Sequence, residues 1–357
     1  MTTTTTTERG TSPTDAGHVK NEDGTWVIKH NDYREELVGD NRSRYRLEGD
    51  RFTEIAELVR QATTSHWNES EVIVYLDKTK WEKLPLALRE VTKNVFAFFY
   101  GFDSLVGINV VENLHARSGH ALMRRFFGEQ ISIEGVHEDV YWKFASLVST
   151  DEELLRIRDG IYEIPNIAKM HQWSSKYMRT ELSFAEILVA SAITESVFFS
   201  AMFHFFAQLK PLNLLPNVTN ANDFISRDEG LHVMGACSMY RMLTHKLPNE
   251  YVEKMIREAV DIKIDFLRTF LPKDEPIINV DDFENHVRLV ANKTASMLGC
   301  RQLYAVHDEP TTANRFALDT KTNFFDSPST EYTNLTNGDA EIYGPDGKLL
   351  INTDGDF

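Results

Sequence analysis

Two short segments of the chain carry the pattern Glu-x-x-His. The first is IEGVH, with Glu134 and His137, and the second is RDEGLH, with Glu229 and His232. Residues three apart lie on one face of a helix, so each pair can direct two donor groups at one metal ion. Imidazole and carboxylate ligands suit iron, manganese and zinc. One such pair alone is weak support for a metal site, because both residue types are common on helix surfaces.

A single carboxylate on an otherwise apolar stripe precedes each of these pairs. Asp103 interrupts a stripe of apolar residues between positions 96 and 110, and Glu195 interrupts another between 188 and 202. The same order, a helix with one carboxylate followed by a helix with Glu-x-x-His, therefore occurs twice. This internal repeat raises the expectation that all four segments meet at one site.

Charge balance favours two metal ions at that site. Buried ionised carboxylates are very unfavourable unless they are paired or bound to metal. Four carboxylates carry a charge that two divalent cations would neutralise. The competing interpretation is that each acid pairs with Arg or Lys, but the apolar stripes offer few such partners. One carboxylate from each of two helices and Glu-x-x-His from two others resembles the ferritin-like di-iron and di-manganese proteins.

The elements that must position these residues are long helices. Apolar residues recur at helical spacing from residue 46 to about 305, and no run shows convincing strand alternation. We therefore predict an all-α fold, a ferritin-like helical bundle with a dimetal site in its four-helix core. Asn249 is expected to cap one of the helices. The expected helices lie at about 84–114, 121–148, 151–176, 183–209, 220–245, 249–271 and 281–300.

The two ends of the chain read differently from the middle. Residues 1–45 include a threonine run at 2–7 and few apolar residues, which predicts a flexible N-terminal arm and no signal peptide. Residues 46–318 are expected to form the helical domain. Residues 319–357 carry eight acidic residues against two lysines, which indicates a flexible acidic tail.

Composition excludes several classes of protein. The formal charge of −16 argues against a nucleic-acid partner. The apolar stretch 187–207 is long enough to span a membrane, but Glu195 near its centre favours a buried helix of a soluble bundle. Cys237 and Cys300 form no CxxC pair and cannot make a disulfide scaffold, so we expect a reducing, cytoplasmic location and no membrane.

From about residue 50 to 335 the chain resembles the small (β) subunit of class I ribonucleotide reductase. The resemblance is carried by ISRDEGLH at 225–232 and ITESVFFS at 193–200. It implies two metal ions per chain, with iron expected and manganese or a mixed Mn/Fe pair as alternatives. The ligand set that it implies is Asp103, Glu134, His137, Glu195, Glu229 and His232.

The resemblance also implies a radical tyrosine. Tyr141, in HEDVY, lies one helical turn after His137 at the position where this family oxidises a tyrosine to a stable radical. Phe199, Phe203 and Ile225 match the apolar pocket that keeps water and reductants away from that radical. The simpler interpretation, packing in an ordinary core, applies to all four residues.

The same resemblance places Trp67 and Asp228 on the route by which the oxidising equivalent leaves. Asp228 could hydrogen-bond both a ligand histidine and the indole N–H of Trp67, so that it orients the histidine. An ordinary buried aromatic is the alternative for Trp67.

The resemblance also implies a function for the acidic tail. KTNFFDSPSTEY resembles the segment that carries a transfer tyrosine, here Tyr332, with Tyr343 as the competing candidate. NTDGDF at the end resembles the peptide that docks on the large subunit, with Phe357 as its apolar anchor. Ribonucleotide reductase large subunit is thus the expected partner, through the tail, and a homodimer is the family expectation.

The implied function is that of a radical-generating small subunit of ribonucleoside-diphosphate reductase. Such a subunit activates oxygen, stores a tyrosyl radical and passes the oxidising equivalent to the large subunit, which reduces ribonucleotides to deoxyribonucleotides. The alternative is a ferritin-like dimetal oxidase or hydroxylase that acts directly on a small or lipid-like substrate, which would need neither Trp67 nor Tyr332. An iron store is a third class, and the tail and Tyr141 fit it poorly.

Overall fold

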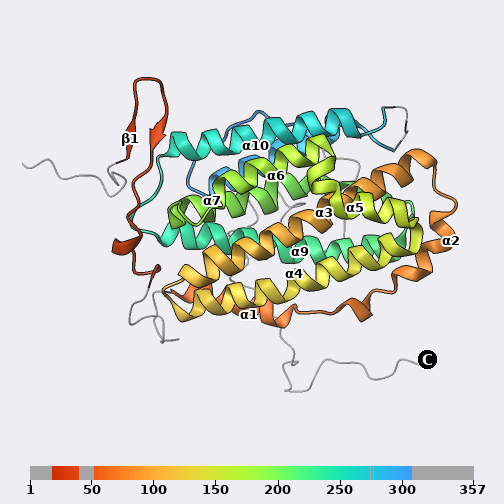
Figure 1. The fold of residues 1–357 in the computed structure, drawn as a ribbon, viewed down its shortest axis with the longest axis horizontal. Coiled ribbons are helices and arrows are strands. Elements are labelled where there is room, and N and C mark those ends of the chain that lie inside the picture. Colours follow the sequence, from red (N-terminus) through yellow and green to blue (C-terminus); the bar gives the residue numbers. More distant parts are fainter. Residues whose placement is uncertain (1–17, 40–51, 274, 276, 308–357) are drawn as a thin grey trace, which may run out of the picture. The chain divides into compact units, whose positions relative to one another are not determined.

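The structure is a computed structural model, and it describes residues 18–39, 52–273, 275 and 277–307. Apart from one antiparallel pair of short strands, β1 (Val19–Lys20) and β2 (Trp26–Val27), the regular elements of these residues are helices (Figure 1). This confirms the predicted all-α class. The α-helices are α1 (Thr53–Thr64), α2 (Lys78–Trp81), α3 (Leu86–Asn109), α4 (Ala121–Val148), α5 (Asp151–Glu163), α6 (Pro165–Tyr177), α7 (Phe184–Ile193), α8 (Phe199–Leu209), α9 (Pro216–Met242), α10 (Asn249–Phe270) and α11 (Val280–Met297).

Short helices of other types complete the described part of the protein. Three are 3-10 turns, and two are π-helical segments that continue or join α-helices. They are η1 (Asp32–Arg34), η4 (Glu69–Glu71), η5 (Val74–Asp77), η6 (Val110–His115) and η7 (Thr194–Phe198). The segment η6 prolongs α3, and η7 joins α7 to α8, so that three elements form one long helical rod.

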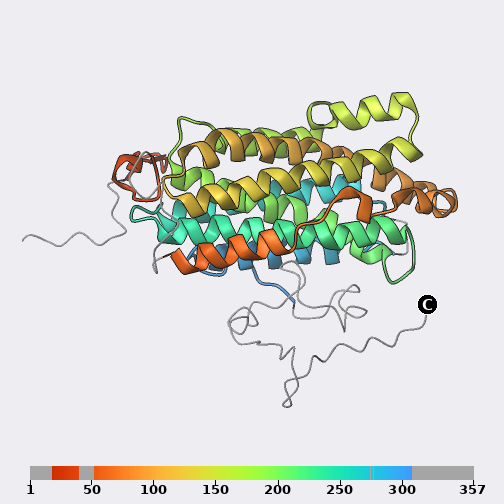
Figure 2. The same ribbon diagram turned by 90° about the horizontal axis from the view of Figure 1, so that it is seen from below.

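The core is built from four helical rods, namely α3, α4, α7–η7–α8 and α9. The helix α3 packs on α4, while α9 packs on α4, α7 and α8. Outside them, α1 lies against α4 and α9, as the turned view shows (Figure 2). The helices α10 and α11 pack on each other and on the α7–η7–α8 rod. Each of the four core rods carries part of the predicted metal site.

Prolines set several helix boundaries. The helix predicted at 151–176 is two helices, because Ile164 has an extended backbone with ψ of 110° and Pro165 starts a new helix. A proline disfavours helical geometry in the residue before it and cannot donate to the preceding turn. The helix expected from 220 begins at Pro216. Asn249 is the first residue of α10 and not its cap, which is Pro248.

Two helical rods are long and apolar enough to cross a membrane, Leu86–His115 and Phe184–Leu209. The second contains the stretch that raised this question, and its most apolar 18-residue window is entirely buried inside the bundle. The expectation of a core helix is therefore confirmed. Its apolar surface is used to pack against α9, α10 and α11.

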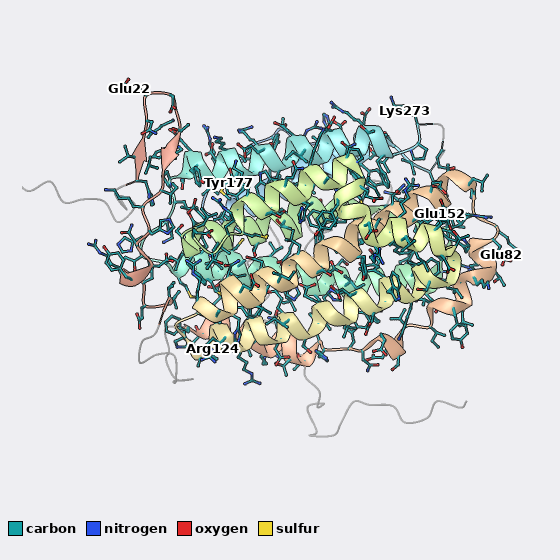
Figure 3. The ribbon with its side chains drawn as sticks, viewed as in Figure 1. Glu22, Glu82, Arg124, Glu152, Tyr177 and Lys273 are labelled. Carbon is teal, nitrogen blue, oxygen red and sulfur yellow. The ribbon has the colours of Figure 1, made fainter. Side chains whose placement is uncertain are left out.

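The N-terminal part of the described residues differs from the expected flexible arm. Residues 18–39 form the β1–β2 hairpin, with Glu22 at its tip, and the turn η1 (Figure 3). The buried carboxylate of Glu35 accepts hydrogen bonds from the backbone N–H groups of Thr244 and His245, at 2.9 and 2.6 Å. Few apolar residues are needed here, because polar contacts with the loop after α9 hold the segment.

A stacked pair of buried histidines predicts how stability depends on pH. The rings of His204 and His286 lie 4.3 Å apart between α8 and α11. Burial lowers the pKa of His204 to about 4, from an ordinary 6.5. Burial, with the charges of His204 and Lys293, also lowers the pKa of His286. Below pH 6.5 the unfolded protein therefore takes up protons that the folded protein does not, so acid favours unfolding until about pH 4.

We expect the free energy of unfolding of the metal-free protein to fall between pH 7 and 4.5. In His204→Leu the fall should be smaller by about 2–3 kcal/mol, since one pKa unit corresponds to about 1.4 kcal/mol. Urea unfolding followed by circular dichroism at several pH values measures this. The exposed His30→Leu should show the wild-type slope. Parallel curves for wild type and His204→Leu would contradict the prediction.

Candidate metal centre

The four core rods bring the six predicted ligands together. Asp103 lies on α3, Glu134 and His137 on α4, Glu195 in η7, and Glu229 and His232 on α9. All six side chains are buried. Two groups of three could each hold a metal ion, with their donor atoms within 4.8 Å of one another. One group is Asp103, Glu134 and His137, and the other is Glu134, Glu229 and His232.

Glu134 belongs to both groups, so one carboxylate stands between two candidate metal positions. The two histidines direct their Nδ1 atoms inward from either side. His137 Nδ1 lies 3.1 Å from Glu229 Oε1 and 3.5 Å from Glu134 Oε2. His232 Nδ1 lies 3.3 Å from Glu134 Oε1 and 3.2 Å from Glu229 Oε2. This shared arrangement is what a pair of metal ions bridged by carboxylates requires.

Glu195 is not a member of either group of three, but it lies beside His232 of the second group. Its Oε2 lies 3.8 Å from His232 Nδ1, and its Oε1 accepts a hydrogen bond from Gln130 Nε2 at 3.2 Å. Gln130 is buried on α4, one turn before Glu134. Gln130 is not among the site residues that were predicted from the sequence. Its position on the ligand face of α4, four residues before Glu134, is the signal that could have found it.

These six residues fit a dimetal centre because several of their carboxylate oxygens are buried and have no hydrogen-bond partner among the described residues. Both carboxylate oxygens of Asp103 and the Oε2 of Glu195 are buried and accept no hydrogen bond from the described residues. A buried carboxylate without such a partner is costly. No Lys or Arg among the described residues forms an ion pair with the six ligands, so the competing interpretation of acids paired with basic residues fails there.

The pKa values of the carboxyl groups also show that burying four acids together is unfavourable. Burial raises the pKa of Asp103, and the neighbouring carboxylates of Glu134 and Glu229 raise it further. Burial likewise raises the pKa of Glu195. For Glu134 burial acts upward, but hydrogen bonds and charge from His137 and His232 outweigh it and lower its pKa to about 2. The protein alone thus cannot keep all four acids ionised, whereas cations would.

A hydrogen-bonded path leads from His137 to Trp67. Trp67 Nε1 donates to Asp228 Oδ2 at 2.7 Å, and the same oxygen lies 3.4 Å from His137 Nε2. The predicted contacts of Asp228 with a ligand histidine and with the indole are therefore present. Burial acts to raise the pKa of Asp228, but its bonds to His137, the charges of His137 and Arg227, and its bond to Trp67 together lower it.

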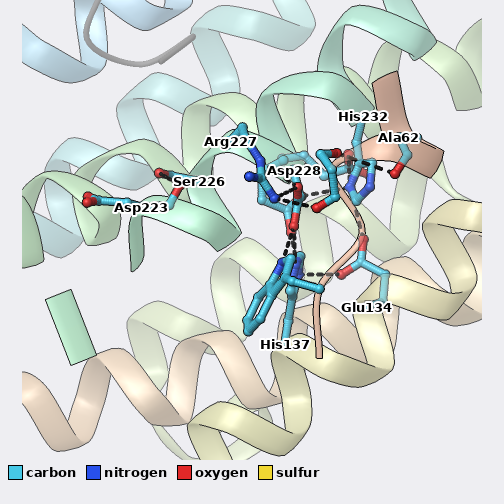
Figure 4. Close-up of polar contacts among 12 residues, drawn as sticks. Ala62, Glu134, His137, Asp223, Ser226, Arg227, Asp228 and His232 are labelled. Carbon is cyan, nitrogen blue, oxygen red and sulfur yellow. Dashed lines mark hydrogen bonds and ion pairs between the residues drawn. The ribbon is translucent and has the colours of Figure 1, made fainter. Parts of the chain in front are cut away.

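Arg227, which was not among the predicted site residues, holds this path in place. Its guanidinium donates to Asp228 Oδ1 at 3.1 and 2.9 Å and to the backbone carbonyl of Ser65 at 2.8 Å (Figure 4). Ser65 lies two positions before Trp67, so Arg227 ties the segment that carries Trp67 to α9. The only signal in the sequence is its place beside Asp228 in ISRDEGLH.

Tyr141 lies in an aromatic enclosure one turn from His137. Its ring stacks parallel on Phe99 at 4.6 Å, and Phe99 in turn contacts the rings of Phe199 at 5.5 Å and Phe203 at 5.0 Å. Among the described residues the Tyr141 hydroxyl has no hydrogen-bond partner. Burial first, and then the charge of Asp103, raise its pKa well above the usual value, so the phenol is neutral.

The remaining predicted residues divide into two sets. Ile225 is buried on α9, one turn before Glu229, as the expected pocket requires. Tyr332, Tyr343 and Phe357 lie outside the described residues, as does the whole tail.

A close contact behind His232 gives a prediction on stability. A Cβ atom at Gly235 would overlap the ring of Phe126, and that ring packs edge-on against His232, with centroids 6.5 Å apart. We expect Gly235→Ala to lower the free energy of unfolding by about 1–3 kcal/mol, as overpacking does. Gly135→Ala is the matched control, because a Cβ there meets nothing within 4 Å. Thermal or urea unfolding of both variants measures the difference, and equal stabilities would contradict the predicted overlap.

Comparison with known proteins agrees with this geometry. Residues 50–311 match the family model of ribonucleotide reductase, small chain. The protein is 32% identical to a ribonucleoside-diphosphate reductase small chain of Arabidopsis thaliana, over 87% of its own length and 93% of the relative's. It is 31% identical to the small subunit of Dictyostelium discoideum, over 86% and 91%.

Solved structures share the fold. The ribonucleotide reductase Rnr4 homodimer from Saccharomyces cerevisiae superposes with a TM-score of 0.71 at 22% identity, covering 77% of this protein and 88% of that one. Dimanganese(II)-NrdF from Streptococcus sanguinis superposes with a TM-score of 0.65 at 18% identity, covering 76% and 98%. These two likenesses concern the fold alone.

Proposed function

The chain belongs to the ribonucleotide reductase small-chain family, and from this premise we propose that six residues of its core would hold two metal ions, whose oxygen chemistry would leave a stored radical on Tyr141. The family's activity is that of class I ribonucleoside-diphosphate reductase, in which the small subunit serves the large one. The single observation that carries the proposal is the sharing of Glu134 by two groups of donor atoms, two turns of α4 before an enclosed tyrosine. The direct oxidase acting on a small or lipid-like substrate is not favoured, because the relatives are reductase small chains.

The proposed ligands are the six residues of the centre, with Asp103 and His137 on one metal, Glu195 and His232 on the other, and Glu134 and Glu229 near both. Bound metal ions would supply the oxygen chemistry that removes one electron from Tyr141. Iron is the proposed metal. Manganese or a mixed pair uses the same ligand types, and the likeness to a dimanganese protein keeps manganese as the second candidate.

When Tyr141 becomes a radical it loses one electron and the proton of its hydroxyl, and both would be taken up by the oxygen that the bound metal ions reduce to water. Its phenol is neutral beforehand, because burial raises its pKa. Phe99 covers one face of its ring, and Phe199, Phe203 and Ile225 fill the buried space around them. These side chains exclude water and reductants, which is what a long-lived radical needs.

The oxidising equivalent is proposed to leave along His137, Asp228 and Trp67. The hydrogen bonds at 2.7 and 3.4 Å through one oxygen of Asp228 support this route, since they join a metal ligand to an aromatic side chain. Tyr332 in the tail is proposed as the next carrier, with Tyr343 as its competitor. The tail, ending at Phe357, is proposed to dock on the large subunit.

The remaining proposals concern assembly and location. A homodimer is supported by the likeness to a protein that is described as a homodimer. A cytoplasmic location is supported by Cys237 and Cys300, which are both buried and free.

The deciding experiment adds ferrous iron and then oxygen to metal-free protein. Metal is counted, and electron paramagnetic resonance is recorded on protein made with ordinary and with ring-deuterated tyrosine. We expect about two metal ions per chain, by the count of ligand groups, and a tyrosyl signal whose hyperfine splitting collapses on deuteration. If the protein binds two iron ions but gives no tyrosyl signal, the loading would be repeated with manganese. Absence of the signal there as well would favour the direct oxidase. Failure to bind metal would overturn the proposal.

The tail offers a test that separates the reductase from the oxidase. Removal of residues 338–357 should abolish turnover with the large subunit while the tyrosyl signal and the metal content stay unchanged. Undiminished biological activity of the shortened protein would favour the direct oxidase.

A further inference from the structure

A narrow cavity leads toward the metal centre between the end of α1, α4 and α9. His66 follows α1 at its outer side, Glu129 stands on α4, and His232 and Asp228 on α9 lie at its inner end. Its interior of about 10 Å³ has room for about one water molecule. Figure 4 shows Ala62 of α1, which also lines the cavity, beside His232.

The residues that line this cavity range from exposed to buried. His66 is exposed, Glu129 is partly buried, and Leu231 and His232 are buried, with His232 only 4% exposed. The cavity therefore has both a solvent-exposed residue, His66, and a buried ligand of the metal centre, His232, in its lining.

The imidazole of His232 directs one nitrogen at the metal centre. Its Nδ1 faces inward, 3.2 Å from Glu229 and 3.3 Å from Glu134. Nδ1 is thus engaged with the carboxylates of the centre, and the His232 side chain also lines the cavity. His137 is placed differently, because Asp228 occupies its Nε2 side and Trp67 stands behind Asp228. The described centre is thus more open beside His232 than beside His137.

The charges along the passage suit a cation. Glu129 brings a carboxylate to the outer half, where its Oε1 accepts one hydrogen bond, from Thr63 at 3.4 Å. The nearby guanidinium of Arg227 is committed to Asp228 and to the carbonyl of Ser65. A divalent ion that enters from water therefore meets the oxygen of Glu129 and the imidazole of His66 before it reaches His232. These are ligand types that first-row divalent metals accept.

We propose that this cavity is the entry route of divalent metal ions and that Glu129, assisted by His66, captures the incoming ion before it passes to His232. The inference rests on the proposed function, since it assumes a dimetal centre. Glu129 and His66 would act only while metal is being loaded. Neither belongs to the two groups of donor atoms that form the centre. Leu231 and Ile133, both buried, form the apolar walls that narrow the passage.

The test is the rate of metal uptake, measured by stopped flow with Mn²⁺ and a fluorescent chelator in competition. Metal-free Glu129→Gln should take up Mn²⁺ more slowly by about three- to tenfold at low salt, and the difference should shrink at high salt, because a carboxylate steers cations electrostatically. Ala62→Phe, which adds bulk to the cavity, should slow uptake at every salt concentration. Both variants should reach the wild-type metal content in the end.

Asp139→Asn is the matched control, because it removes an exposed carboxylate from the same helix outside the cavity. It should load at the wild-type rate. Wild-type rates in Glu129→Gln, His66→Ala and Ala62→Phe, with normal final metal content, would overturn the entry route and leave the proposed function intact. Absence of metal binding in the wild-type protein would instead overturn the proposed function, and the entry route with it.

Discussion

Tyr141→Phe is expected to bind two metal ions per chain but to support no ribonucleotide reduction. The substitution removes only the hydroxyl, which has no hydrogen-bond partner among the described residues, so the fold and the ligands should be unaffected. Phenylalanine cannot lose a phenolic proton and electron, so no radical is stored. Turnover with the large subunit should fall by at least about a thousandfold, as for the loss of a group on which the whole reaction depends.

Reductase assays and electron paramagnetic resonance on the same samples measure this effect. Tyr240→Phe is the matched control, since Tyr240 is equally buried but lies on α9 and bonds to the backbone of Leu247. That variant should retain the tyrosyl signal. A Tyr141→Phe protein with normal turnover would show that the radical resides elsewhere.

Glu134→Ala should abolish metal binding at both positions. Glu134 is shared by the two groups of donor atoms, so its loss removes an oxygen from each. Mutating a residue that only hydrogen-bonds to a metal ligand typically lowers metal affinity by about 10–100-fold. Removing a ligand that both sites share should lower the affinity of each site by more than that. The variant should still fold, because the substitution also removes a buried carboxylate that the metal-free protein must accommodate.

Metal titration followed by calorimetry, with circular dichroism to verify folding, measures the change. Asp139→Ala, an exposed carboxylate on the same helix, should bind metal like the wild type. Retention of one tightly bound ion by Glu134→Ala would show that the two sites are independent, which contradicts the shared position of this residue.

Much of the metal centre could be predicted because its charged residues lie on helix faces that are otherwise apolar. A carboxylate on an apolar stripe, such as Asp103 or Glu195, is conspicuous, and helical spacing places Glu134 and His137 on one face. The four core helices follow from the same periodicity. Their mutual packing was an expectation from resemblance, since periodicity identifies a buried face but not the neighbour that covers it.

The features that escaped prediction depend on tertiary contacts. Gln130 and Arg227 are ordinary polar residues on helices, and only folding brings them to Glu195 and to Asp228. The break between α5 and α6 depends on Ile164, whose extended backbone follows from Pro165, a signal present in the sequence but not used. The hairpin within residues 18–39 is too short to show strand alternation.

The π-helical segment η7 sets a rule for insertions and deletions. A wide turn there holds one residue more than a regular α-helix would, and Glu195 lies within it. Thr294 Oγ1 donates to Ser196 at 2.9 Å and Ser174 bonds Thr194 at 3.0 Å, so the wide turn is fastened to α11 and α6. Because the wide turn accommodates the extra residue, deleting one residue between 194 and 198 would let a regular α-turn form while α8 keeps its orientation. Phe199 and Phe203 would then keep their places on α8, whereas Glu195 would lose the wide turn in which it lies, so such a deletion should disturb the metal site and not the aromatic enclosure of Tyr141.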